Sequence, residues 1–491
     1  MLTTPAPQLL IDGKLRGAAG GETFTILNPA TEQVIGAAPD AGADDMDAAI
    51  GAARRAFDET GWATDVEFRV HCLRQLHQAL LDNGGAMRAL TTAEAGAPAA
   101  LTLGPQYDVP VASLSWTIDL AARYEWEQDL GTAAPMGVPT ARRVRREAVG
   151  VVGAITPWNF PNQINLAKIG PALAAGNTVV LKPAPDTPWL AAELGRLAAE
   201  HTDIPAGVFN VVTSREHAVG AALASDPRVD LVSFTGSTAT GRAVMAAAAP
   251  TLKRVFLELG GKSAAIVLDD GDLGAGAGLA AFSVCMHAGQ GCALTTRLIV
   301  PRSRYDEAVE IAAATMRHVP FGDPTDPATI CGPLISAAQR ERVEGYLALA
   351  VDEGGRFATG GGRPLGEEIW QRGYWIEPTV IAGVGNDARV AREEIFGPVL
   401  VVIAHDGDDD AVRIANDSPY GLSGSVTSAD PERARAVAAR IRTGTISVNG
   451  GVWFSADAPF GGYKQSGVGR EMGVAGFEEY LETKLVAEGI R

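Results

Sequence analysis

The sequence predicts an α/β protein built on parallel sheets. From about residue 145 to 268, short β-branched runs alternate with stretches rich in alanine and leucine. The β-branched runs, which we expect to be strands, cover residues 149–155, 178–181, 208–212, 231–234 and 255–257. The stretches that we expect to be helices cover residues 189–201, 218–224 and 241–249. This alternation indicates βαβ units, and parallel sheets of this kind bind ligands at the carboxyl ends of their strands.

A second alternating region, from about residue 263 to 460, predicts a second α/β domain. Its expected strands cover residues 297–300 and 399–403, and its expected helices cover 305–316, 339–353 and 409–416. A glycine-rich turn occupies residues 354–362. The chain has 491 residues, which is enough for about two to four domains.

The remaining segments complete the expected layout. Residues 44–60 have apolar side chains at helical spacing behind an acidic start, and a second helix is expected over 66–82, with Gly84 and Gly85 as its stop signal. Residues 129–147 place a Pro/Gly turn between two extended arms, which predicts a protruding hairpin. The last segment, 480–490, can form a strand, and a second subunit is a natural partner for its exposed edge.

Composition and charge argue against several classes of partner. Hydrophobic residues make up 46% and charged residues 20% of the chain, as in ordinary globular proteins. A formal net charge of -17 argues against nucleic acid or an anionic membrane as a partner. The one basic run, residues 142–146, is short and is expected to be a solvated or subunit-facing strand. The apolar stretch 273–288 is shorter than the about 18 residues of a membrane span, so we expect a buried helix there.

The N-terminus and the cysteines point to the cytoplasm. Residues 1–10 have neither a basic segment nor a long apolar one, so no signal peptide is expected. The four cysteines form no CxxC pair, and we expect no metal site. So few cysteines in a long acidic chain fit a reducing compartment, where a thiol is free to act as a nucleophile.

Three side chains are candidates for chemistry. A lone cysteine is more often a small buried hydrophobe, but Cys292 follows two glycines, which let the backbone approach a ligand closely. Glu258 lies among apolar residues and just before a Gly-Gly pair, which is a costly place for an idle carboxylate. Asn159 lies between two prolines, where it could also be an ordinary turn residue. A thiol, a carboxylate and an amide are the parts needed to take an aldehyde through a thioester to an acid.

Seven short motifs follow one another along the chain. They are Pro157-Trp158-Asn159-Phe160-Pro161, Lys182-Pro183, Phe234-Thr235-Gly236-Ser237, Leu257-Glu258-Leu259-Gly260-Gly261-Lys262-Ser263, Gly289-Gln290-Gly291-Cys292, Glu393-Glu394-Ile395-Phe396-Gly397-Pro398 and Pro459-Phe460-Gly461-Gly462-Tyr463-Lys464. One of them alone would be weak evidence, but seven in order and register are very specific. On these motifs the chain resembles the aldehyde dehydrogenase superfamily over nearly its whole length.

The resemblance implies a role for each of the three candidate side chains. Cys292 would attack the aldehyde carbonyl as a thiolate, with its pKa lowered by nearby donors or charge. The amide of Asn159 and the backbone N–H of Cys292 would stabilise the oxyanion of the thiohemiacetal. Hydride transfer leaves a thioester, and Glu258 would activate the water that hydrolyses it. Because family members that pass the acyl group to coenzyme A generally lack this glutamate, Glu258 favours release of the free acid.

The resemblance also implies a nicotinamide cofactor, although the chain lacks a strand-following GxGxxG motif. Gly236 and Ser237, between an expected strand and helix, would bind the pyrophosphate, and Lys182 would bind the adenosine ribose. Glu394 would bind the nicotinamide ribose, and Phe396 would pack near the ring. The other positions expected to contact the cofactor are Ile155, Thr156, Pro157, Trp158, Glu258 and Gln339.

One departure from the family pattern bears on the choice between NAD and NADP. Many NAD-preferring members have a glutamate three residues after the lysine, where this chain has Pro185. The missing carboxylate removes a repulsion against a 2′-phosphate, but no arginine beside Lys182 would bind that phosphate. We expect NAD, and the sequence leaves NADP open.

The substrate tunnel implied by the resemblance has an aromatic and apolar lining, which favours a hydrophobic or aromatic aldehyde. Each candidate lining residue could equally be part of the core. These candidates are Phe160, Gln163, Ile164, Met286, Trp453, Phe454 and Phe460.

The implied architecture is a Rossmann-like NAD(P)-binding domain (residues 1–128 and 148–258), an α/β catalytic domain (259–460) and oligomerisation segments (129–147 and 461–491), one of them a β-hairpin arm. The resemblance implies a homotetramer, with a dimer as the alternative. Three other functions remain open at this point: a dehydrogenase that acylates coenzyme A, a thiol esterase that uses Cys292 and Asn159, and a non-catalytic structural role.

Overall fold

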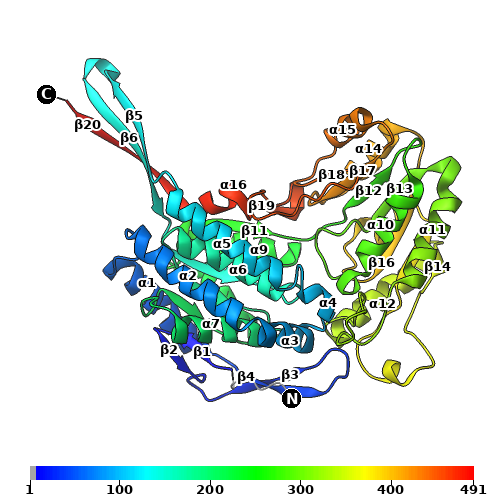
Figure 1. Cartoon of the computed structure of the whole chain (residues 1–491), viewed down its shortest axis with the longest axis horizontal. Helices are drawn as coiled ribbons and strands as arrows, with labels where there is room; N and C mark the ends of the chain where they lie inside the picture. Colours follow the sequence, from blue (N-terminus) through cyan, green and yellow to red (C-terminus); the bar gives the residue numbers. More distant parts are fainter. Residues whose placement is uncertain (1–6, 491) are drawn as a thin grey trace.

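Two large sheets, each covered by helices, organise the chain into two lobes (Figure 1). The computed structural model describes residues 7–490. Most of the segment 1–10, for which no signal peptide is expected, therefore lies outside the described residues. No helix within 7–490 combines the length and apolar character needed to cross a membrane.

The first sheet has eight strands, and its central five run parallel. In spatial order the strands are β19 (Gly467–Val468), β11 (Arg254–Glu258), β10 (Leu231–Thr235), β7 (Val151–Ile155), β8 (Thr178–Lys182), β9 (Phe209–Val211), β1 (Leu9–Ile11) and β2 (Lys14–Arg16). The five predicted strands of the first alternating region are therefore confirmed as the parallel centre. Register aligns Ile155 with Lys182 and Thr235 with Glu258, so the carboxyl ends of these strands meet at one edge.

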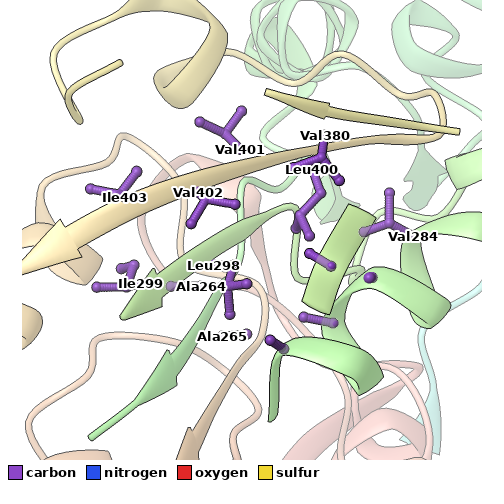
Figure 2. Packing of buried hydrophobic residues seen from close by; sticks show 14 of the residues in the cluster. Ala264, Ala265, Val284, Leu298, Ile299, Val380, Leu400, Val401, Val402 and Ile403 are labelled. Atoms are coloured by element: carbon purple, nitrogen blue, oxygen red, sulfur yellow. The ribbon is translucent and has the colours of Figure 1, made fainter. Parts of the chain in front are cut away.

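The second sheet has seven strands around an aliphatic core. In spatial order they are β14 (Arg356–Thr359), β15 (Thr379–Ala382), β16 (Val399–His405), β13 (Arg297–Pro301), β12 (Ala264–Val267), β17 (Gly424–Thr427) and β18 (Ser447–Val448). Figure 2 shows side chains of β13 and β16, among them Leu298, Val402 and Ile403, gathered in this core. Because these side chains are aliphatic and mostly β-branched, they suit strands that are buried on both faces.

Helices cover both sheets, and most lie where they are expected. They are α1 (Ala43–Glu59), α2 (Val66–Asp82), α3 (Gly84–Ala95), α4 (Ala99–Thr102), α5 (Asp108–Arg123), α6 (Pro161–Ala174), α7 (Pro188–His201), α8 (His217–Ser225), α9 (Thr238–Ala248), α10 (Leu273–Cys285), α11 (Tyr305–His318), α12 (Ala337–Asp352), α13 (Arg389–Arg392), α14 (Asp408–Asn416), α15 (Pro431–Ala438) and α16 (Gly473–Glu478). Strands and helices together confirm the predicted α/β fold class.

Two details differ from the expectation. Gly84 and Gly85 do not simply end a helix, because α2 ends at Asp82 and Gly84 already begins α3. The apolar stretch 273–288 is helical only to Cys285, and α10 exposes one apolar face at Leu279 and Phe282. The helix stops there because His287, Ala288 and Gly289 adopt left-handed backbone conformations.

A three-stranded sheet projects from the first lobe (Figure 1). The predicted hairpin is present as β5 (Glu127–Ala133) and β6 (Thr140–Ala148), and β20 (Leu481–Gly489) pairs antiparallel with β6. One edge of the C-terminal strand is therefore paired within its own chain rather than with a second subunit. The separate two-stranded ribbon of β3 (Thr23–Leu27) and β4 (Val34–Pro39) lies near the N-terminus.

Candidate active site

A cavity of about 280 Å³ lies where the carboxyl ends of the first sheet's strands meet loops of the second lobe. The loop after β7 contributes one wall, β10 and β11 lead into another, and Cys292, α12 and the loop before β16 close it. The lining residues are Pro157, Trp158, Asn159, Thr235, Gly236, Ser237, Leu259, Gly260, Cys292, Gln339, Arg342, Glu394 and Phe396. Motifs spread from Pro157 to Phe396 thus meet around one space.

Most of the site residues expected from the sequence line this cavity. Four of them do not line it, namely Ile155, Thr156, Lys182 and Glu258, which lie in or directly after the strands that lead to it. Conversely, Thr235, Leu259, Gly260 and Arg342 line it without having been singled out as site residues. The first three belong to recognised motifs, whereas Arg342 is one helical turn after Gln339, a spacing that could have indicated it.

Glycines let the motifs approach one another closely. A Cβ on Gly260 would lie 2.5 Å from a carboxylate oxygen of Glu394, and one on Gly261 would lie 2.4 Å from the carbonyl oxygen of Cys292. The N–H of Gly261 donates to Glu394 at 2.8 Å. The Gly-Gly pair that follows Leu259 therefore lets the Cys292 backbone and the Glu394 carboxylate approach closely, because a Cβ at either position would clash with them.

The loop before Cys292 is held in an unusual shape. His287, Ala288 and Gly289 have φ values of 49°, 52° and 71°, and a Cβ on Gly289 would lie 2.0 Å from the Gly397 carbonyl oxygen. Left-handed conformations cost energy in residues other than glycine, and they cluster at functional sites. The fully buried amide of Gln290 fastens this loop: it donates to His287 O at 3.0 Å and accepts from Ile335 N at 2.9 Å.

The side-chain amide of Asn159 faces the same loop. Asn159 is buried, and its Nδ2 donates to the carbonyl oxygen of Gln290 at 2.9 Å, two residues before the thiol in sequence. An amide nitrogen carries two protons, so one remains for another acceptor. Asn159 and Cys292 both line the cavity, which places an N–H donor and a thiol on the same space.

The pKa of the Cys292 thiol is raised, which overturns the expectation that it would be lowered. Burial is the largest cause, and the carboxylates of Glu258, Glu394 and Glu471 add to it. Without a cationic neighbour to offset them, three negative groups disfavour a thiolate. The protein alone therefore holds Cys292 as a neutral thiol.

Glu258 is an isolated, buried carboxyl group. It ends β11 and is 2% exposed, and neither of its carboxylate oxygens has a hydrogen-bond partner within residues 7–490. Burial and the charge of Glu471 raise its pKa well above the ordinary value, against the opposing charges of Lys168 and Arg470. A carboxylate with a raised pKa is a stronger base than an exposed one, which suits removal of a proton from water.

A buried ion pair near Glu258 was not anticipated from the sequence. Lys168, on α6, is fully buried and lies 2.8 Å from Glu471, and it also donates to Ser233 Oγ at 3.0 Å. Lys168 stands in an otherwise apolar turn of α6, which is the one signal that could have drawn attention to it. Glu471 raises and Lys168 lowers the pKa of the Glu258 carboxyl, so the two effects partly cancel.

The expected pyrophosphate residues form a helix cap. Ser237 is the N-cap of α9, and its Oγ accepts from Thr240 N at 3.2 Å. Thr235 lines the cavity just before it, and its buried hydroxyl has no hydrogen-bond partner in the described chain. A helix N-terminus beside a free hydroxyl fits an anionic phosphate group.

Lys182 lies at the carboxyl end of β8, as expected, and is almost fully buried. Its Nζ donates to the carbonyls of Ser214 at 2.9 Å and Pro183 at 3.2 Å, and its backbone carbonyl accepts from Thr156 N. Burial lowers its pKa to about 8, and the carboxylates of Asp40 and Asp186 oppose this. The Lys182 amino group is thus surrounded by backbone carbonyls, at the end of a strand that leads to the cavity.

The residues expected around the nicotinamide are linked to one another. The rings of Trp158 and Phe396 meet edge to face, 5.4 Å apart, and Phe396 has a left-handed backbone with φ 63°. Gln339 Nε2 donates to the Phe396 carbonyl at 2.7 Å and thereby supports this conformation. Burial raises the pKa of Glu394 to about 7, although the hydrogen bond from the Gly261 N–H acts to lower it.

The candidate substrate-tunnel residues do not line this cavity. Gln163 lines a smaller one between α5, α6 and the segments around Ala456 and Met472. The rings of Trp453 and Phe460 stack 5.4 Å apart, and Phe160 packs edge-on against His287. Ile164 is buried, and Met286 and Phe454 are half-buried.

Comparison with known proteins decides the family. The model of the aldehyde dehydrogenase family matches residues 16–486. The chain belongs to the aldehyde dehydrogenase family. The prediction of this family from seven motifs is confirmed, as is the prediction of an aldehyde-oxidising enzyme with an α/β fold.

Two relatives show the level of similarity in sequence. The chain is 44% identical to 3-succinoylsemialdehyde-pyridine dehydrogenase of a Pseudomonas species over 98% of both chains. It is 40% identical to geranial dehydrogenase of Castellaniella defragrans over 99% of both chains. These aldehyde dehydrogenases carry names for chemically different aldehydes, so the family alone does not fix the substrate.

Solved structures of aldehyde dehydrogenases match the whole fold. A point mutant of betaine aldehyde dehydrogenase from Staphylococcus aureus, in complex with NAD⁺, has a TM-score of 0.95 and 34% identity, covering 99% of this chain and 98% of that chain. A mutant of aldehyde dehydrogenase C from Pseudomonas syringae, in complex with NAD⁺ and octanal, has a TM-score of 0.92 and 39% identity. The match covers 98% of this chain and 96% of that chain.

Proposed function

We propose that this aldehyde dehydrogenase uses Cys292 as its nucleophile and releases a free carboxylic acid. The observation that carries the proposal is the meeting of Cys292, Asn159, Glu394 and Phe396 around one cavity, with Glu258 buried at the end of β11. The Cys292 thiol would release its proton to water, and the thiolate sulfur would then add to the aldehyde carbonyl carbon, while the Asn159 amide and the Cys292 N–H would bind the resulting oxyanion.

The cofactor is NAD, as in the solved complexes of the relatives. When bound, it accepts the hydride of the thiohemiacetal carbon. Ser237 and the N-terminus of α9 would hold its pyrophosphate, and Glu394, Trp158 and Phe396 would surround the nicotinamide half. The unpartnered Thr235 hydroxyl and the helix cap fit this anionic group. Asp40 and Asp186, whose charges act on Lys182, favour NAD over a 2′-phosphorylated cofactor, since a phosphate would meet like charge there.

Glu258 is proposed as the base of the second half-reaction. A thioester remains on Cys292 after hydride transfer, and water is a poor nucleophile without a base. The Glu258 carboxylate would take a proton from that water as it attacks the thioester carbonyl, releasing the acid and the thiol. Its buried position and raised pKa support this role and disfavour transfer of the acyl group to coenzyme A.

The preferred aldehyde is proposed to be hydrophobic or aromatic. Support comes from the apolar character of the predicted tunnel residues, including the stacked pair Trp453 and Phe460, and from the octanal complex of a relative. Rates on a panel of aliphatic, aromatic and amino aldehydes, with NAD and with NADP, would establish the substrate class.

The architectural proposals follow the expected boundaries. Residues 1–128 and 148–258 would bind NAD, residues 259–460 would form the catalytic domain, and residues 129–147 and 461–491 would serve oligomerisation. Two observations support assembly: the projecting sheet keeps β5 and β20 as its edges, and it exposes Leu130, Leu485 and Val486. A homotetramer in the cytoplasm is proposed, in line with four cysteines that form no disulfide in the described chain.

Replacing the thiol tests the proposal. Cys292→Ala should abolish NAD-dependent aldehyde oxidation, measured as reduced-cofactor absorbance, because none of the other residues that line the cavity carries a thiol. Cys285→Ala is the matched control, since this buried cysteine ends α10, seven residues before Cys292, and does not line the cavity. Turnover by the Cys292→Ala enzyme at the rate of the Cys285→Ala enzyme would contradict the assignment.

A further inference from the structure

A buried glutamine from the N-terminal part of the chain contacts the proposed oxyanion donor. Gln106 lies in the loop between α4 and α5 and is fully buried. Its Nε2 donates to the backbone carbonyl of Asn159 at 2.9 Å. Because a carbonyl oxygen can only accept, the NH₂ end of the Gln106 amide must face it.

Gln106 is itself firmly anchored. Its backbone N–H donates to the Leu101 carbonyl at 3.0 Å, and its own carbonyl accepts from Asn162 Nδ2 at 2.9 Å. The side chain therefore extends from a fixed point on one element to the loop after β7. A fixed donor of this kind limits where the Asn159 backbone can lie.

The other end of the Gln106 amide has no partner. Its Oε1 is buried and accepts no hydrogen bond within residues 7–490. An unpaired buried carbonyl costs stability, and an apolar side chain of the same shape would avoid that cost. A polar residue that is unfavourable for stability alone indicates a function for the one hydrogen bond that it makes.

Gln106 is the first link of a chain of three amides. Gln106 Nε2 donates to the Asn159 carbonyl, Asn159 Nδ2 donates to the Gln290 carbonyl, and the Gln290 amide bonds to Ile335 N. Asn159 is thus held at its backbone from one side and at its side chain from the other. The remaining amide proton of Asn159 then has one direction in which to point.

We propose that Gln106 is a positioning residue that fixes the Asn159 amide for the oxyanion. The inference rests on the proposed role of Asn159 as oxyanion donor. A preorganised donor stabilises the developing charge only if it does not have to move, so loosening its backbone lowers the rate of thiohemiacetal formation. Gln106 does not line the cavity and acts only through Asn159.

A double-mutant cycle tests this role. Gln106→Met keeps the length of the side chain and removes its donor, and Gln106→Leu is a second variant with the same purpose. Tyr107→Phe is the matched control, because it removes an equally buried bond, Tyr107 Oη to the Leu80 carbonyl at 2.6 Å, from the neighbouring residue. Each variant is made in the wild-type enzyme and in Asn159→Ala, which retains the backbone carbonyl that Gln106 binds.

The readout is the rate of the first-turnover burst of NADH, together with the KM for NAD and the melting temperature. Gln106→Met should slow the burst about tenfold, since a donor that is loosened loses part of the 10²–10³-fold effect of an oxyanion-hole donor. The KM for NAD and the melting temperature should match those of Tyr107→Phe. In the Asn159→Ala background, Gln106→Met should change the burst rate less than about twofold, because the donor through which it acts is gone.

Three results would overturn the proposal. One is a burst rate in Gln106→Met equal to that of Tyr107→Phe, and another is a full tenfold effect that persists in Asn159→Ala. The third is failure of both Gln106 variants to fold, which would mean that the glutamine serves the fold. Failure of the underlying role of Asn159 is separate, because Asn159→Ala alone would then show the wild-type burst rate.

Discussion

At the residue scale, the site depends on charges that the protein leaves unbalanced. Glu258, Glu394 and Glu471 all act on the Cys292 thiol, and the buried cation Lys168 is already paired with Glu471. The same burial that raises the pKa of the thiol also raises that of Glu258. Burial therefore disfavours the ionised form of both the nucleophile and the base.

This arrangement predicts that the rate of acyl-enzyme hydrolysis depends on pH and falls on the acid side. Only the deprotonated Glu258 can accept a proton from water, so the hydrolysis rate should fall as pH drops through its raised pKa, at a pH well above that of an exposed glutamate. A pH jump applied to preformed acyl-enzyme measures this step alone, because Cys292 is then already acylated. A hydrolysis rate that stays constant down to the pKa of an ordinary glutamate would show that Glu258 is not the titrating base.

At the scale of elements, strands and helices were predictable because their signals are local. The β-branched runs at 178–181 and 231–234 and the acidic start of α1 need no knowledge of the rest of the chain. The left-handed turn at His287 and Ala288 could not be predicted, because it depends on contacts with the segment around Gly397. The motifs located Cys292, Glu258 and Asn159, whereas Lys168, Glu471 and Gln106 matter only through the residues that the fold brings to them.

The direction of the pKa shift of the Cys292 thiol could not be predicted from the sequence either. A glycine-flanked cysteine suggests reactivity and hence a lowered pKa, but the shift depends on burial and on carboxylates from β11, the loop before β16 and the segment after β19. Sequence neighbours of Cys292 contain none of these charges. The direction of a pKa shift in a buried site therefore follows from tertiary structure rather than from the motif.

At the scale of the whole molecule, the two large sheets both contribute to the cavity, and the projecting sheet does not. β5, β6 and β20 project from the first lobe (Figure 1), none of their residues lines the cavity, and β20 is exposed along most of its length. Leu485 is 60% exposed there, and Val486 and Leu130 of the same three-stranded sheet are exposed as well. The arm thus supports the proposed assembly without contributing to the chemistry.

A charge placed on the projecting sheet of β5, β6 and β20 should disrupt subunit assembly while the subunit still folds. Leu485→Arg should lower the mass measured by light scattering during size-exclusion chromatography, because a buried unpaired charge disfavours the interface. Leu365→Arg is the control: that leucine is 89% exposed in a loop of the second lobe. An unchanged mass for Leu485→Arg would place the subunit interface elsewhere.

The most direct test of the account is a single-turnover experiment on Glu258→Gln. The variant keeps the shape of the side chain but cannot act as a base, so NADH should form in one stoichiometric burst and then stop, and mass spectrometry of proteolytic fragments should find the acyl group on Cys292. Continued steady turnover at the wild-type rate, or an enzyme without an acyl group on Cys292 after the burst, would contradict a thioester that Glu258 hydrolyses.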